Sequence, residues 1–574
     1  MDAFFPSIRY AGRNKHIRRE STSMIYRIPT ERLILLCTCL LMGASSPAFS
    51  GAYYLSEIGT RSLARGGANV VNPGDPSAIW LNPAAITNST GVQLQLNNSL
   101  VFLNSSFVRD CGPTGSCGPR TTNLRYGAFG YQTDGQGRAP SNDETHFATH
   151  TPNASTLGKY QDPSQFGDRH AVVNQALPQY VPSFFATLNL DSFGLDGFAI
   201  GAGFFAPHAG DYQFPANETT RYTLIDRDLY EVFYSLTLGY RFQKWLSIGG
   251  SLQGVTSGLK QQIKISADPY GNENPDQDIL IELEGFQHFI PSGNFGLWTE
   301  LLPGLEFGSS VQLGRRVEAT GPLRLLEFGP GVEELMASDG TNPALVEIEE
   351  DNPQATVRFT MPPFYRTGLK YGMERLFGGW FGFDVELDFV YEQWSVFDHI
   401  SVASKGVGFR FSGGEPEALP PIVQPKNYND CWSVRLGGQV DFLERLLQLR
   451  SGIFYETAAI PNETYTVELQ NGEKIGVGLG MSLQYWGVRF DFGYAHLFLK
   501  DRVVGDESII HVENTAPPTL SPGERRTRVA MGQYSASYDM LTFAVNIAFD
   551  EMFGFGVVDK APWEKGLIPV ISDQ

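Results

Sequence analysis

Hydrophobic and polar residues alternate with a period of two along most of the chain after residue 90. The clearest segments are Trp380–Glu392, Asp430–Leu443, Gly487–Tyr494 and Leu541–Phe549. In the first segment, aromatic and aliphatic side chains occupy one face, and Asp384, Glu386 and Asp388 occupy the other. Such alternation predicts β-strands that have one apolar face and one polar face.

The alternation recurs along the chain and defines fourteen strands. The predicted strands are 91–106, 179–191, 196–207, 229–242, 245–262, 281–298, 304–317, 354–371, 378–397, 430–443, 447–457, 474–486, 487–499 and 531–549. Short connections alternate with long ones, of which 107–178 is the longest. Short periplasmic turns, long extracellular loops and an even number of antiparallel strands are typical of outer-membrane barrels. We therefore predict an all-β fold, a 14-stranded antiparallel transmembrane β-barrel, with a secreted soluble β protein as the alternative.

The segment ahead of the strands, residues 51–90, has a different pattern. Glycine and proline interrupt it every few residues, yet it carries apolar side chains such as Tyr53, Ile79, Trp80 and Leu81. A turn-rich segment of this polarity has to be buried inside something larger. We predict that it forms a plug, called the hatch below, inside the lumen of the barrel formed by residues 91–549.

Residues 1–50 have the features of a signal peptide. The apolar run Leu33–Met42 is shorter than the roughly 20 residues that a spanning helix needs, and basic residues precede it. Ala48 and Ser50 fit a cleavage site, so the mature chain is expected to begin at Gly51. Met24 is a second possible translation start.

Composition and cysteine usage narrow the range of functions. The formal net charge of −19 argues against a nucleic-acid partner. Cys111 and Cys117 flank the turn-forming sequence GPTGS, which predicts a disulfide in an oxidising compartment. Cys431 has no evident partner and is expected to pack within its strand.

Catalytic and metal-binding motifs are absent from the sequence. There is no nucleophile elbow, phosphate loop or helical His-Glu-x-x-His pattern. His288 and His496 are the remaining candidates for a hydrolase at the membrane boundary. Acidic and amide residues at Asp268, Asn272, Glu273, Asn274, Asp276 and Asp278 form either a calcium loop or, as we expect, a solvated acidic loop. We therefore expect no enzyme and no metal site.

Several motifs occur in an order that resembles one family. They are Asn82-Pro83-Ala84 after LARGGANVVNPGDPSAIWL, FGGWFGFDVELDFVYEQWSVFDHI, NYNDCWSVRLGGQVDF, LRSGIFYETAAIP and MPPFYRTGLKY. Over nearly all of the mature chain, the sequence resembles the outer-membrane long-chain fatty acid and aromatic hydrocarbon transporters (FadL/OmpP1/TodX type). The resemblance implies a monomer in the bacterial outer membrane that works without ATP, metal or another cofactor.

The resemblance also implies a passive transport route. A hydrophobic compound, expected to be a long-chain fatty acid, would be captured on extracellular loops, bind in the lumen, displace the hatch around Asn82, Pro83 and Ala84, and leave sideways into outer-membrane lipid. An aromatic or alkane hydrocarbon is the alternative cargo. A general porin and a surface adhesin or receptor are alternatives from other classes.

Candidate residues follow for each step of this route. The capture surface would lie in an extracellular loop and comprise Leu323, Leu325, Leu326, Phe328, Val332, Leu335 and Met336, unless a short helix there covers itself against the neighbouring loop 279–286. Gly201, Gly203 and Pro207 would interrupt the third strand and form a lateral gate, or else make room for the hatch. Lys260, Arg435 and Arg489 are the possible partners of a carboxylate, although nearby acidic residues could neutralise them.

The C-terminal residues depart from the usual barrel pattern. Phe549 fits the terminal aromatic residue of such barrels, but residues 550–574 follow it. We expect these residues to form a periplasmic tail.

Overall fold

The computed structural model describes residues 58–71, 75–109, 125–126, 132–133, 171–266, 273, 275–332, 345–348, 352–377, 380–410, 417–418, 421–512 and 528–553. All of them belong to one compact unit within residues 47–574. The predicted signal peptide, residues 1–50, and the predicted disulfide between Cys111 and Cys117 lie outside the described residues.

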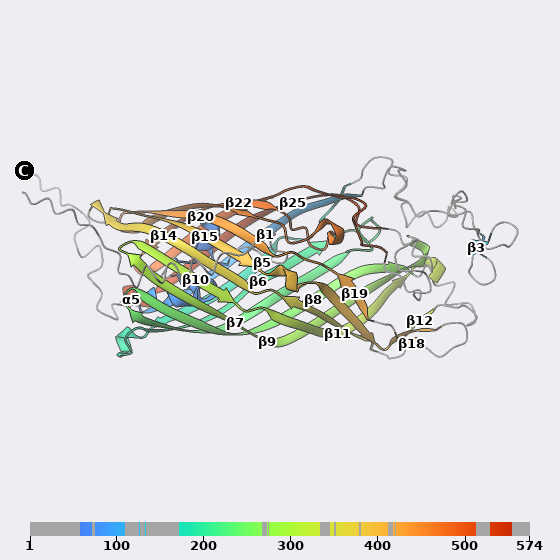
Figure 1. Cartoon of the computed structure of the whole chain (residues 1–574), viewed down its shortest axis with the longest axis horizontal. Coiled ribbons are helices and arrows are strands. Elements are labelled where there is room, and N and C mark those ends of the chain that lie inside the picture. Colours follow the sequence, from blue (N-terminus) through green and yellow to red (C-terminus); the bar gives the residue numbers. More distant parts are fainter. Residues whose placement is uncertain are drawn as a thin grey trace, which may run out of the picture. The chain divides into compact units, whose positions relative to one another are not determined.

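Strands make up most of the described chain (Figure 1). The largest sheet contains β1 (Val92–Arg109), β4 (Ala171–Val173), β5 (Gln179–Asn189), β6 (Phe198–Gln213), β7 (Asp226–Gln243), β8 (Leu246–Ser266), β9 (Asp278–Leu302), β10 (Leu305–Gln312), β11 (Arg315–Phe328), β13 (Gln354–Met361), β14 (Phe364–Leu376), β15 (Phe381–Glu392), β16 (His399–Lys405), β19 (Ile422–Pro425), β20 (Cys431–Phe442), β21 (Leu447–Glu456), β22 (Lys474–Tyr485), β23 (Val488–Leu499), β24 (Arg502–Val504) and β25 (Gly532–Ala548). Two small sheets contain β2 (Arg125–Tyr126) with β3 (Gln132–Thr133), and β12 (Leu345–Ile348) with β17 (Val407–Arg410) and β18 (Glu417–Ala418).

The large sheet closes on itself as an antiparallel barrel. Its last strand, β25, pairs with its first, β1, from Gln93 opposite Ala548 to Arg109 opposite Gly532. Several passes are divided by short breaks, as between β10 and β11 or between β13 and β14. Counted by passes, the barrel has 14 strands, which confirms the prediction. Closure pairs the first strand with the last, so the sheet has no free edge strand, as a sheet in lipid requires.

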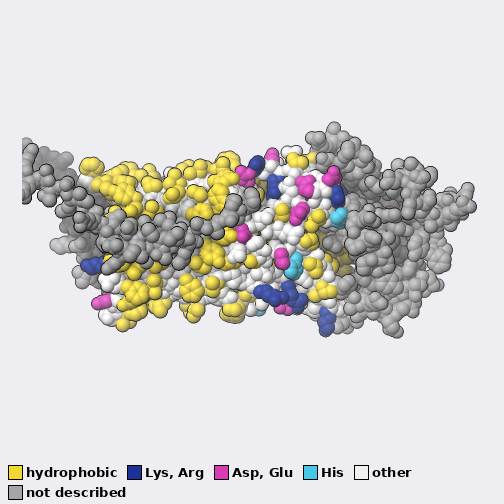
Figure 2. Space-filling model, viewed as in Figure 1, with side chains coloured by type: hydrophobic (Ala, Val, Ile, Leu, Met, Phe, Trp, Pro, Cys, Tyr) yellow, Lys and Arg dark blue, Asp and Glu magenta, His cyan; other side chains and the backbone are white. Residues whose placement is uncertain are grey.

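Each strand turns one row of side chains inward and the other outward. In β20, Ser433 and Arg435 are buried, whereas Val434 and Leu436, which alternate with them, are exposed. Figure 2 shows that hydrophobic side chains cover the outer face along much of the barrel, while charged side chains gather farther along the same face. The apolar surface is the part that lipid can cover, and polar residues are accommodated in the lumen.

The strands continue farther than predicted at the end with the long connections. Residues 279–286 belong to β9, and residues 315–328 form β11, which pairs with β9 and β13. The expectation of loops is therefore wrong for residues 279–286 and 323–328, which are strand, while residues 330–332 are helical and 333–338 lie outside the described residues. Leu323, Leu325, Leu326 and Phe328, four of the residues that suggested a capture loop, are strand residues of β11.

The hatch is confirmed inside the lumen as a chain of short helices. It contains α2 (Thr60–Ala64), α3 (Ala78–Leu81) and the 3₁₀ helix η1 (Pro83–Asn88), and almost all of its described residues are buried. None of the helices in the described part of the chain is long and apolar enough to cross a membrane.

Thr60 at the start of α2 touches both sides of the seam where the barrel closes. Its backbone N–H donates to Asn97 Oδ1 on β1 at 3.3 Å, and its hydroxyl lies 2.7 Å from the hydroxyl of Thr542 on β25. The hatch therefore contributes contacts to the β1–β25 seam as well as filling the lumen.

Glycines of the barrel wall allow the hatch to pack closely against the wall. At each of them a side chain would come within 3.3 Å of a hatch atom; they are Gly201, Gly239, Gly249, Gly296, Gly308, Gly368, Gly437, Gly452, Gly478, Gly480 and Gly493. A Cβ at Gly249, for example, would lie 2.5 Å from the carbonyl carbon of Pro83. Because the obstructing atoms include hatch backbone, these positions have little room for a larger residue.

The described part of the chain ends just beyond the last strand of the barrel. The last strand stops at Ala548, and Phe549–Phe553 forms the short helix α5. Asp550 in this helix accepts a hydrogen bond from the backbone N–H of Val92 at 3.3 Å, next to the start of β1. Phe549 thus begins a helix that follows the last strand, and residues 554–574 of the predicted tail are outside the described residues.

Two neighbouring glycines on β8 test the close fit of the hatch. We expect Gly249→Ala to lower the free energy of unfolding by about 1–3 kcal/mol, because the new methyl group overlaps the backbone of Pro83. Gly250→Ala is the matched control, since its Cβ would lie an ordinary 3.4 Å from the ring of Phe295. Urea unfolding in detergent measures both variants, and equal stabilities would contradict the close fit.

Candidate functional site

An arginine of the hatch pairs with two carboxylates on the lumenal face of β15. Arg65 Nη1 lies 2.6 Å from Asp384 Oδ1, and its Nη2 lies 3.0 Å from Glu386 Oε2. Burial opposes the charge of Arg65, but the two carboxylates outweigh it and raise the pKa of this guanidinium above its ordinary value. The pairing fixes α2 against β15.

The same row of carboxylates also satisfies buried backbone amides of the hatch. Asp388 accepts hydrogen bonds from the N–H groups of Asn69 and Val70 at 2.8 and 3.0 Å. Glu386 accepts one from the N–H of Val71 at 2.6 Å. A buried backbone amide without a partner is costly, so each of these hydrogen bonds stabilises the docked hatch. Residues 384–388 of β15 are therefore the docking strand of the hatch.

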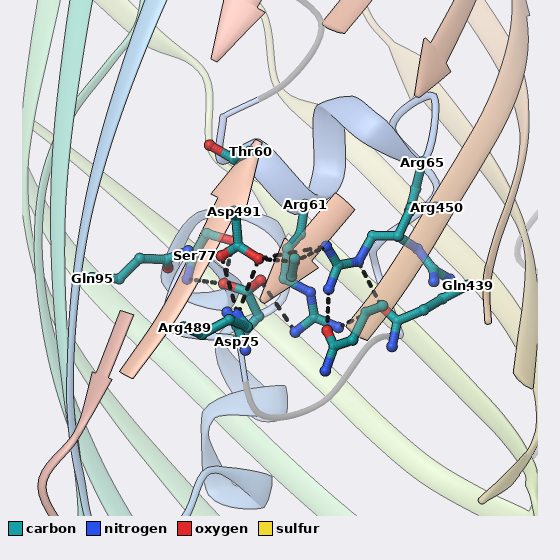
Figure 3. Close-up of polar contacts among 12 residues, drawn as sticks. Thr60, Arg61, Arg65, Asp75, Ser77, Gln95, Gln439, Arg450, Arg489 and Asp491 are labelled. Carbon is teal, nitrogen blue, oxygen red and sulfur yellow. Dashed lines mark hydrogen bonds and ion pairs between the residues drawn. The ribbon is translucent and has the colours of Figure 1, made fainter. Parts of the chain in front are cut away.

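A second polar cluster lies beside this docking strand (Figure 3). Arg61 of α2 pairs with Asp75 at 3.5 Å and donates to Gln439 Oε1 on β20 at 3.1 Å. Arg450 on β21 donates to the same oxygen at 2.6 Å and lies 3.4 Å from Asp491 on β23. The cluster connects α2 with the later part of the hatch and with three strands of the wall.

Asn82 of the predicted Asn82-Pro83-Ala84 motif fixes the second half of the hatch. Its amide nitrogen donates to the carbonyl of Val70 at 3.1 Å and to that of Leu297 on β9 at 3.0 Å. Its Oδ1 accepts from the N–H of Ala84 at 3.2 Å and so caps η1. One side chain thus connects both halves of the hatch to the wall.

An aromatic cluster packs on the α3 side of the hatch. The Trp80 ring lies 5.4 Å from the rings of Phe205 on β6 and Phe233 on β7, and these two phenylalanines stack at 5.5 Å. Phe185 on β5 stacks on Phe205 at 5.3 Å. The side chain of Trp80 is held by apolar packing, in contrast to the charged contacts of α2, while the carbonyls of Trp80 and Leu81 accept hydrogen bonds from Asn294 and Ser310 of the wall.

A buried cation lies in the same cluster. The guanidinium carbon of Arg366 on β14 lies 4.8 Å from the Trp80 ring centre and 5.6 Å from that of Phe364, and Arg366 is 3% exposed. Among the described residues, its Nη1 has no hydrogen-bond partner and no carboxylate forms an ion pair with it. Aromatic rings attract a cation only weakly compared with the cost of burying it. Arg366 is therefore a candidate anion-binding group in an apolar setting.

Two connecting segments at the extracellular end of the barrel pack against the aromatic cluster around Trp80. Residues 214–225 and 457–473 are mostly buried and contribute Phe214, Leu224, Ala459, Ile460, Tyr465, Val467 and Leu469 to the hydrophobic core that contains Trp80. Lys426 Nζ lies 2.6 Å from Glu468 Oε2. Burial alone would raise the pKa of Glu468, but Lys426 holds it below its ordinary value. Both the hatch and these two connecting segments therefore pack against the aromatic cluster.

The residues predicted to capture a ligand lie mainly on β11. Leu323, Leu325 and Phe328 are half-buried, Leu326 is 46% exposed, and Val332 is buried just beyond the strand. Leu335 and Met336 lie outside the described residues. The described members therefore do not form one exposed apolar patch, and their role as a capture surface stays a prediction.

The predicted gate residues divide into two kinds. Gly201 and Gly203 lie in the regularly paired part of β6, where Gly201 accommodates Ile79 of the hatch and Gly203 accommodates the rings of Phe185 and Phe205. Only Pro207 lies at an irregularity, because the register with β7 shifts between Phe205 and His208. The bulge is present, while the two glycines serve close packing.

The three cations predicted to meet a carboxylate already have acidic partners. Lys260, with a side chain 42% exposed, pairs with Glu282 at 3.2 Å. Arg435 lies 3.8 Å from Glu456, and Arg489 lies 3.0 Å from Asp491 within the cluster beside the docking strand. Alternation placed Arg435 and Arg489 correctly in the lumen; Asp491 lies two residues from Arg489 on the same strand, and Glu456 lies on β21, which pairs with the strand of Arg435.

Other candidates are also accounted for in the described residues. The side chain of His496 pairs with Asp539 at 2.8 Å on the outer face, and His288 is exposed on β9.

Asp278 of the acidic stretch pairs with Arg221 at 3.1 Å. The described residues contain no group of three or more His, Cys, Asp or Glu side chains that could hold a metal ion. Cys431 is buried and free on β20, as predicted.

Arg366 is the functional candidate that the sequence interpretation missed. It lies in MPPFYRTGLKY, where Phe364, Arg366, Gly368 and Lys370 share the inward face and Tyr365 and Leu369 face outward. The alternation therefore marks Arg366 as lumenal. What the sequence does not show is that Trp80, from a distant segment, covers it in place of a carboxylate.

Comparisons with known proteins agree with this architecture. A family model described as outer membrane protein transport protein (OMPP1/FadL/TodX) matches residues 41–548. A search of curated proteins found no significant match.

Solved structures share the fold at low sequence identity. A FadL homologue from Pseudomonas aeruginosa is 14% identical with a TM-score of 0.61, and the match covers 87% of this chain and 100% of that chain. The toluene transporter TodX from Pseudomonas putida is 14% identical with a TM-score of 0.52, covering 87% and 99%. The toluene transporter TbuX from Ralstonia pickettii is 16% identical with a TM-score of 0.50, covering 86% and 99%.

The docking strand can be tested by neutralising one carboxylate. Glu386→Gln removes a charged partner of Arg65 and of the Val71 amide, and breaking a buried ion pair costs about 3 kcal/mol. We expect brief hatch openings to become about 100-fold more frequent, which single-channel conductance in planar bilayers records.

The control is Glu318→Gln, the same change in an exposed pair with Arg358, where little stability depends on the charge. Equal conductance of the Glu386 variant and the control would show that β15 does not hold the hatch.

Proposed function

Because the chain belongs to the outer membrane protein transport family (OMPP1/FadL/TodX), we propose that this outer-membrane transporter of hydrophobic compounds carries long-chain fatty acids. The family and the closed barrel support transport of apolar compounds in general. The proposal adds the chemical class of the cargo, an apolar chain with a carboxylate at one end.

The observation that carries this proposal is the buried guanidinium of Arg366. It lies among the rings of Trp80 and Phe364 without an acidic partner in the described residues. A fatty acid would supply the missing carboxylate, and each CH₂ of its chain that leaves water for an apolar site contributes about 0.8 kcal/mol. A hydrocarbon such as toluene would leave the charge unpaired.

The contact between Arg366 and Trp80 suggests how binding would reach the hatch. Trp80 is in α3, and Asn82 directly after α3 anchors the hatch to the wall. A carboxylate at Arg366 would weaken the cation–π contact with Trp80 and free α3 to move. The charged contacts of α2 with β15 would stay in place, so the proposed movement involves the second half of the hatch.

The complete route that we propose has three steps. A fatty acid enters from the extracellular end past the inward-folded segments 214–225 and 457–473. It binds beside Arg366 and displaces α3 with Asn82, Pro83 and Ala84. It then leaves sideways near the bulge at Pro207 into the lipid, where the apolar chain stays buried throughout.

An aromatic hydrocarbon is the second candidate cargo. The rings of Phe185, Phe205 and Phe233 would pack well against a flat apolar molecule. Two of the solved structures with this fold are described as toluene transporters. A fatty acid would need a cation to pair with its carboxylate, whereas an aromatic hydrocarbon would not.

The test compares both cargoes in one variant. Arg366→Met keeps the length of the side chain and removes its charge, so we expect uptake of oleate to fall about tenfold or more and uptake of toluene to stay the same. Uptake is measured in cells that depend on this barrel. Lys260→Met is the control, because Lys260 is exposed and paired with Glu282.

The remaining outcomes separate the alternatives. Unchanged oleate uptake in the Arg366 variant would contradict a fatty acid bound at this residue. An equal fall for oleate and toluene would show that Arg366 supports the structure and does not select the cargo.

A further inference from the structure

The connection between β21 and β22, residues 457–473 and called the strap below, is long, irregular and buried. Its helical part is the short 3₁₀ helix η7 (Asn462–Thr464). Every residue from 464 to 472 is buried. Loops normally run over the protein surface, and irregular loops of this length are usually functional. The burial of this connection therefore needs a specific explanation.

The strap crosses the lumen to the opposite side of the barrel. Glu468 in its second half accepts a hydrogen bond from Gln261 on β8 at 3.1 Å. In the order of the sheet, β23, β25, β1, β5, β6 and β7 lie between β22 and β8 in one direction, and β9, β10, β14, β15 and β20 lie between β8 and β21 in the other. A connection between two neighbouring strands that reaches the far wall has to span the lumen.

The same carboxylate is paired with a cation from another part of the wall. Lys426, which follows β19, places its Nζ 2.6 Å from Glu468 Oε2, and the lysine side chain is 4% exposed. The hydroxyl of Thr464 in the strap donates a hydrogen bond to the carbonyl of Lys426 at 2.6 Å. Glu468 therefore attaches the strap to the wall on two sides of the lumen.

Apolar side chains of the strap pack into the core that also receives the hatch. Tyr465, Val467 and Leu469 belong to the hydrophobic core that contains Trp80. The ring of Tyr465 also meets that of Tyr534 on β25 edge-on, with ring centres 4.9 Å apart. The strap therefore packs on the extracellular side of the core into which α3 inserts Trp80.

One residue of the strap is poorly satisfied in this position. Gln470 is 0% exposed, and among the described residues neither its side-chain oxygen nor its side-chain nitrogen has a hydrogen-bond partner. A buried amide without partners is unfavourable, because water satisfies it when it is exposed. The buried position of the strap is thus stabilised at Glu468 and destabilised two residues away, which suits a segment that leaves the lumen and returns to it.

We propose that the strap is an extracellular lid of the lumen, held closed by the contacts of Glu468 with Lys426 and Gln261, and that it moves out of the lumen to admit the cargo. The lid itself rests on the contacts across the lumen and on the burial of residues 464–472. That its movement admits cargo rests on the proposed function. The lid and the hatch are then two separate barriers that meet at the same apolar core.

Thiol labelling tests the lid without any cargo. Leu469→Cys introduces a thiol at a position that is 5% exposed when the strap is in the lumen. A charged maleimide that does not cross membranes is added to whole cells, and labelling at residue 469 is read by mass spectrometry, so the native cysteines stay in place. We expect Glu468→Gln to raise the labelling rate at least about tenfold, because the strap loses the charge that holds it in the lumen.

Glu473→Gln is the matched control. It neutralises the same kind of side chain at the end of the strap, where Glu473 forms an exposed pair with Lys500 at 2.8 Å. Exposed pairs contribute little stability, so the labelling rate of this control is expected to equal that of the Leu469→Cys parent. Equal labelling rates of Glu468→Gln and of the control would overturn the lid.

A double variant covers the case in which a lone buried charge prevents folding. Glu468→Gln with Lys426→Gln removes both charges together, so neither is left unpaired, and the same rise in labelling is expected. Folding is checked by the shift in gel mobility on heating. A folded double variant with the labelling rate of the parent would also overturn the lid.

Gln470→Leu is expected to change the labelling rate in the opposite direction. The substitution keeps the approximate size of the side chain and removes its unpartnered amide, so labelling at residue 469 should slow by about fivefold or more. A substitution that merely disturbs the packing of the strap would speed labelling. A rate equal to or above that of the parent would overturn the role given to Gln470.

Passage of cargo is tested by fastening the lid. Lys426→Cys with Glu468→Cys places two thiols where the charged ends of the native side chains meet, and a short, cleavable bifunctional maleimide joins them. We expect the joined variant to lose uptake of oleate and to regain it when the reagent is cleaved. Native uptake by the joined variant would overturn the lid as the entry for cargo. If the native protein takes up no oleate, the proposed function fails, while the labelling rates still decide the lid.

Discussion

The closed state depends on matching buried charges between the hatch and the wall. Arg65 and the amides of residues 69–71 are removed from water, and Asp384, Glu386 and Asp388 on one strand supply their partners. A carboxylate or guanidinium buried alone would be far more costly than any single apolar contact could offset. Because the three acids are spaced by two residues on β15, they define one position for α2 and exclude others.

The contacts of the hatch are unevenly distributed as a result. Ion pairs and hydrogen bonds hold its first half against β15 and β20–β23, whereas ring packing against β6 and β7, with neutral hydrogen bonds from Asn294 and Ser310, holds α3. Apolar packing is not directional, so it can be exchanged for contacts with an apolar molecule at little cost. The charged half cannot be exchanged in that way. The irregular part of β6 lies on the side with the exchangeable contacts.

The barrel could be predicted from the sequence because its wall obeys a local rule. A strand between lipid and a polar lumen has to alternate, so rows such as Val434 and Leu436 against Ser433 and Arg435 are visible without any structure. Glycine and proline similarly marked the hatch, and its Asn82-Pro83-Ala84 motif proved to be an anchor. In these cases the sequence pattern and the structural feature that it indicates lie within a few residues of each other.

The candidate site was less accessible because its contacts join distant segments. Arg366 on β14 lies against Trp80 of the hatch and Phe364, a contact that no local pattern shows. Arg435 meets Glu456 on the neighbouring strand, whereas Arg489 meets Asp491 two residues away, as the sequence allowed. Which inward cation meets an acid depends on the shear of the barrel and on the path of the hatch, neither of which is encoded locally. Leu323, Leu325, Leu326 and Phe328 of the predicted capture surface lie on β11, because β9 and β11 extend farther than their alternation indicated, and their role in capture stays a prediction.

The position of Thr60 across the β1–β25 seam also bears on how the barrel is assembled. The hatch precedes β1 in the chain, yet Thr60 is bonded both to the first strand and to the last. The wall glycines leave little clearance for the hatch to slide in through a finished ring. The bonds of Thr60 to both strands can form only when the N-terminal segment lies beside the first and the last strand together, so the hatch stabilises the closed seam from inside the lumen.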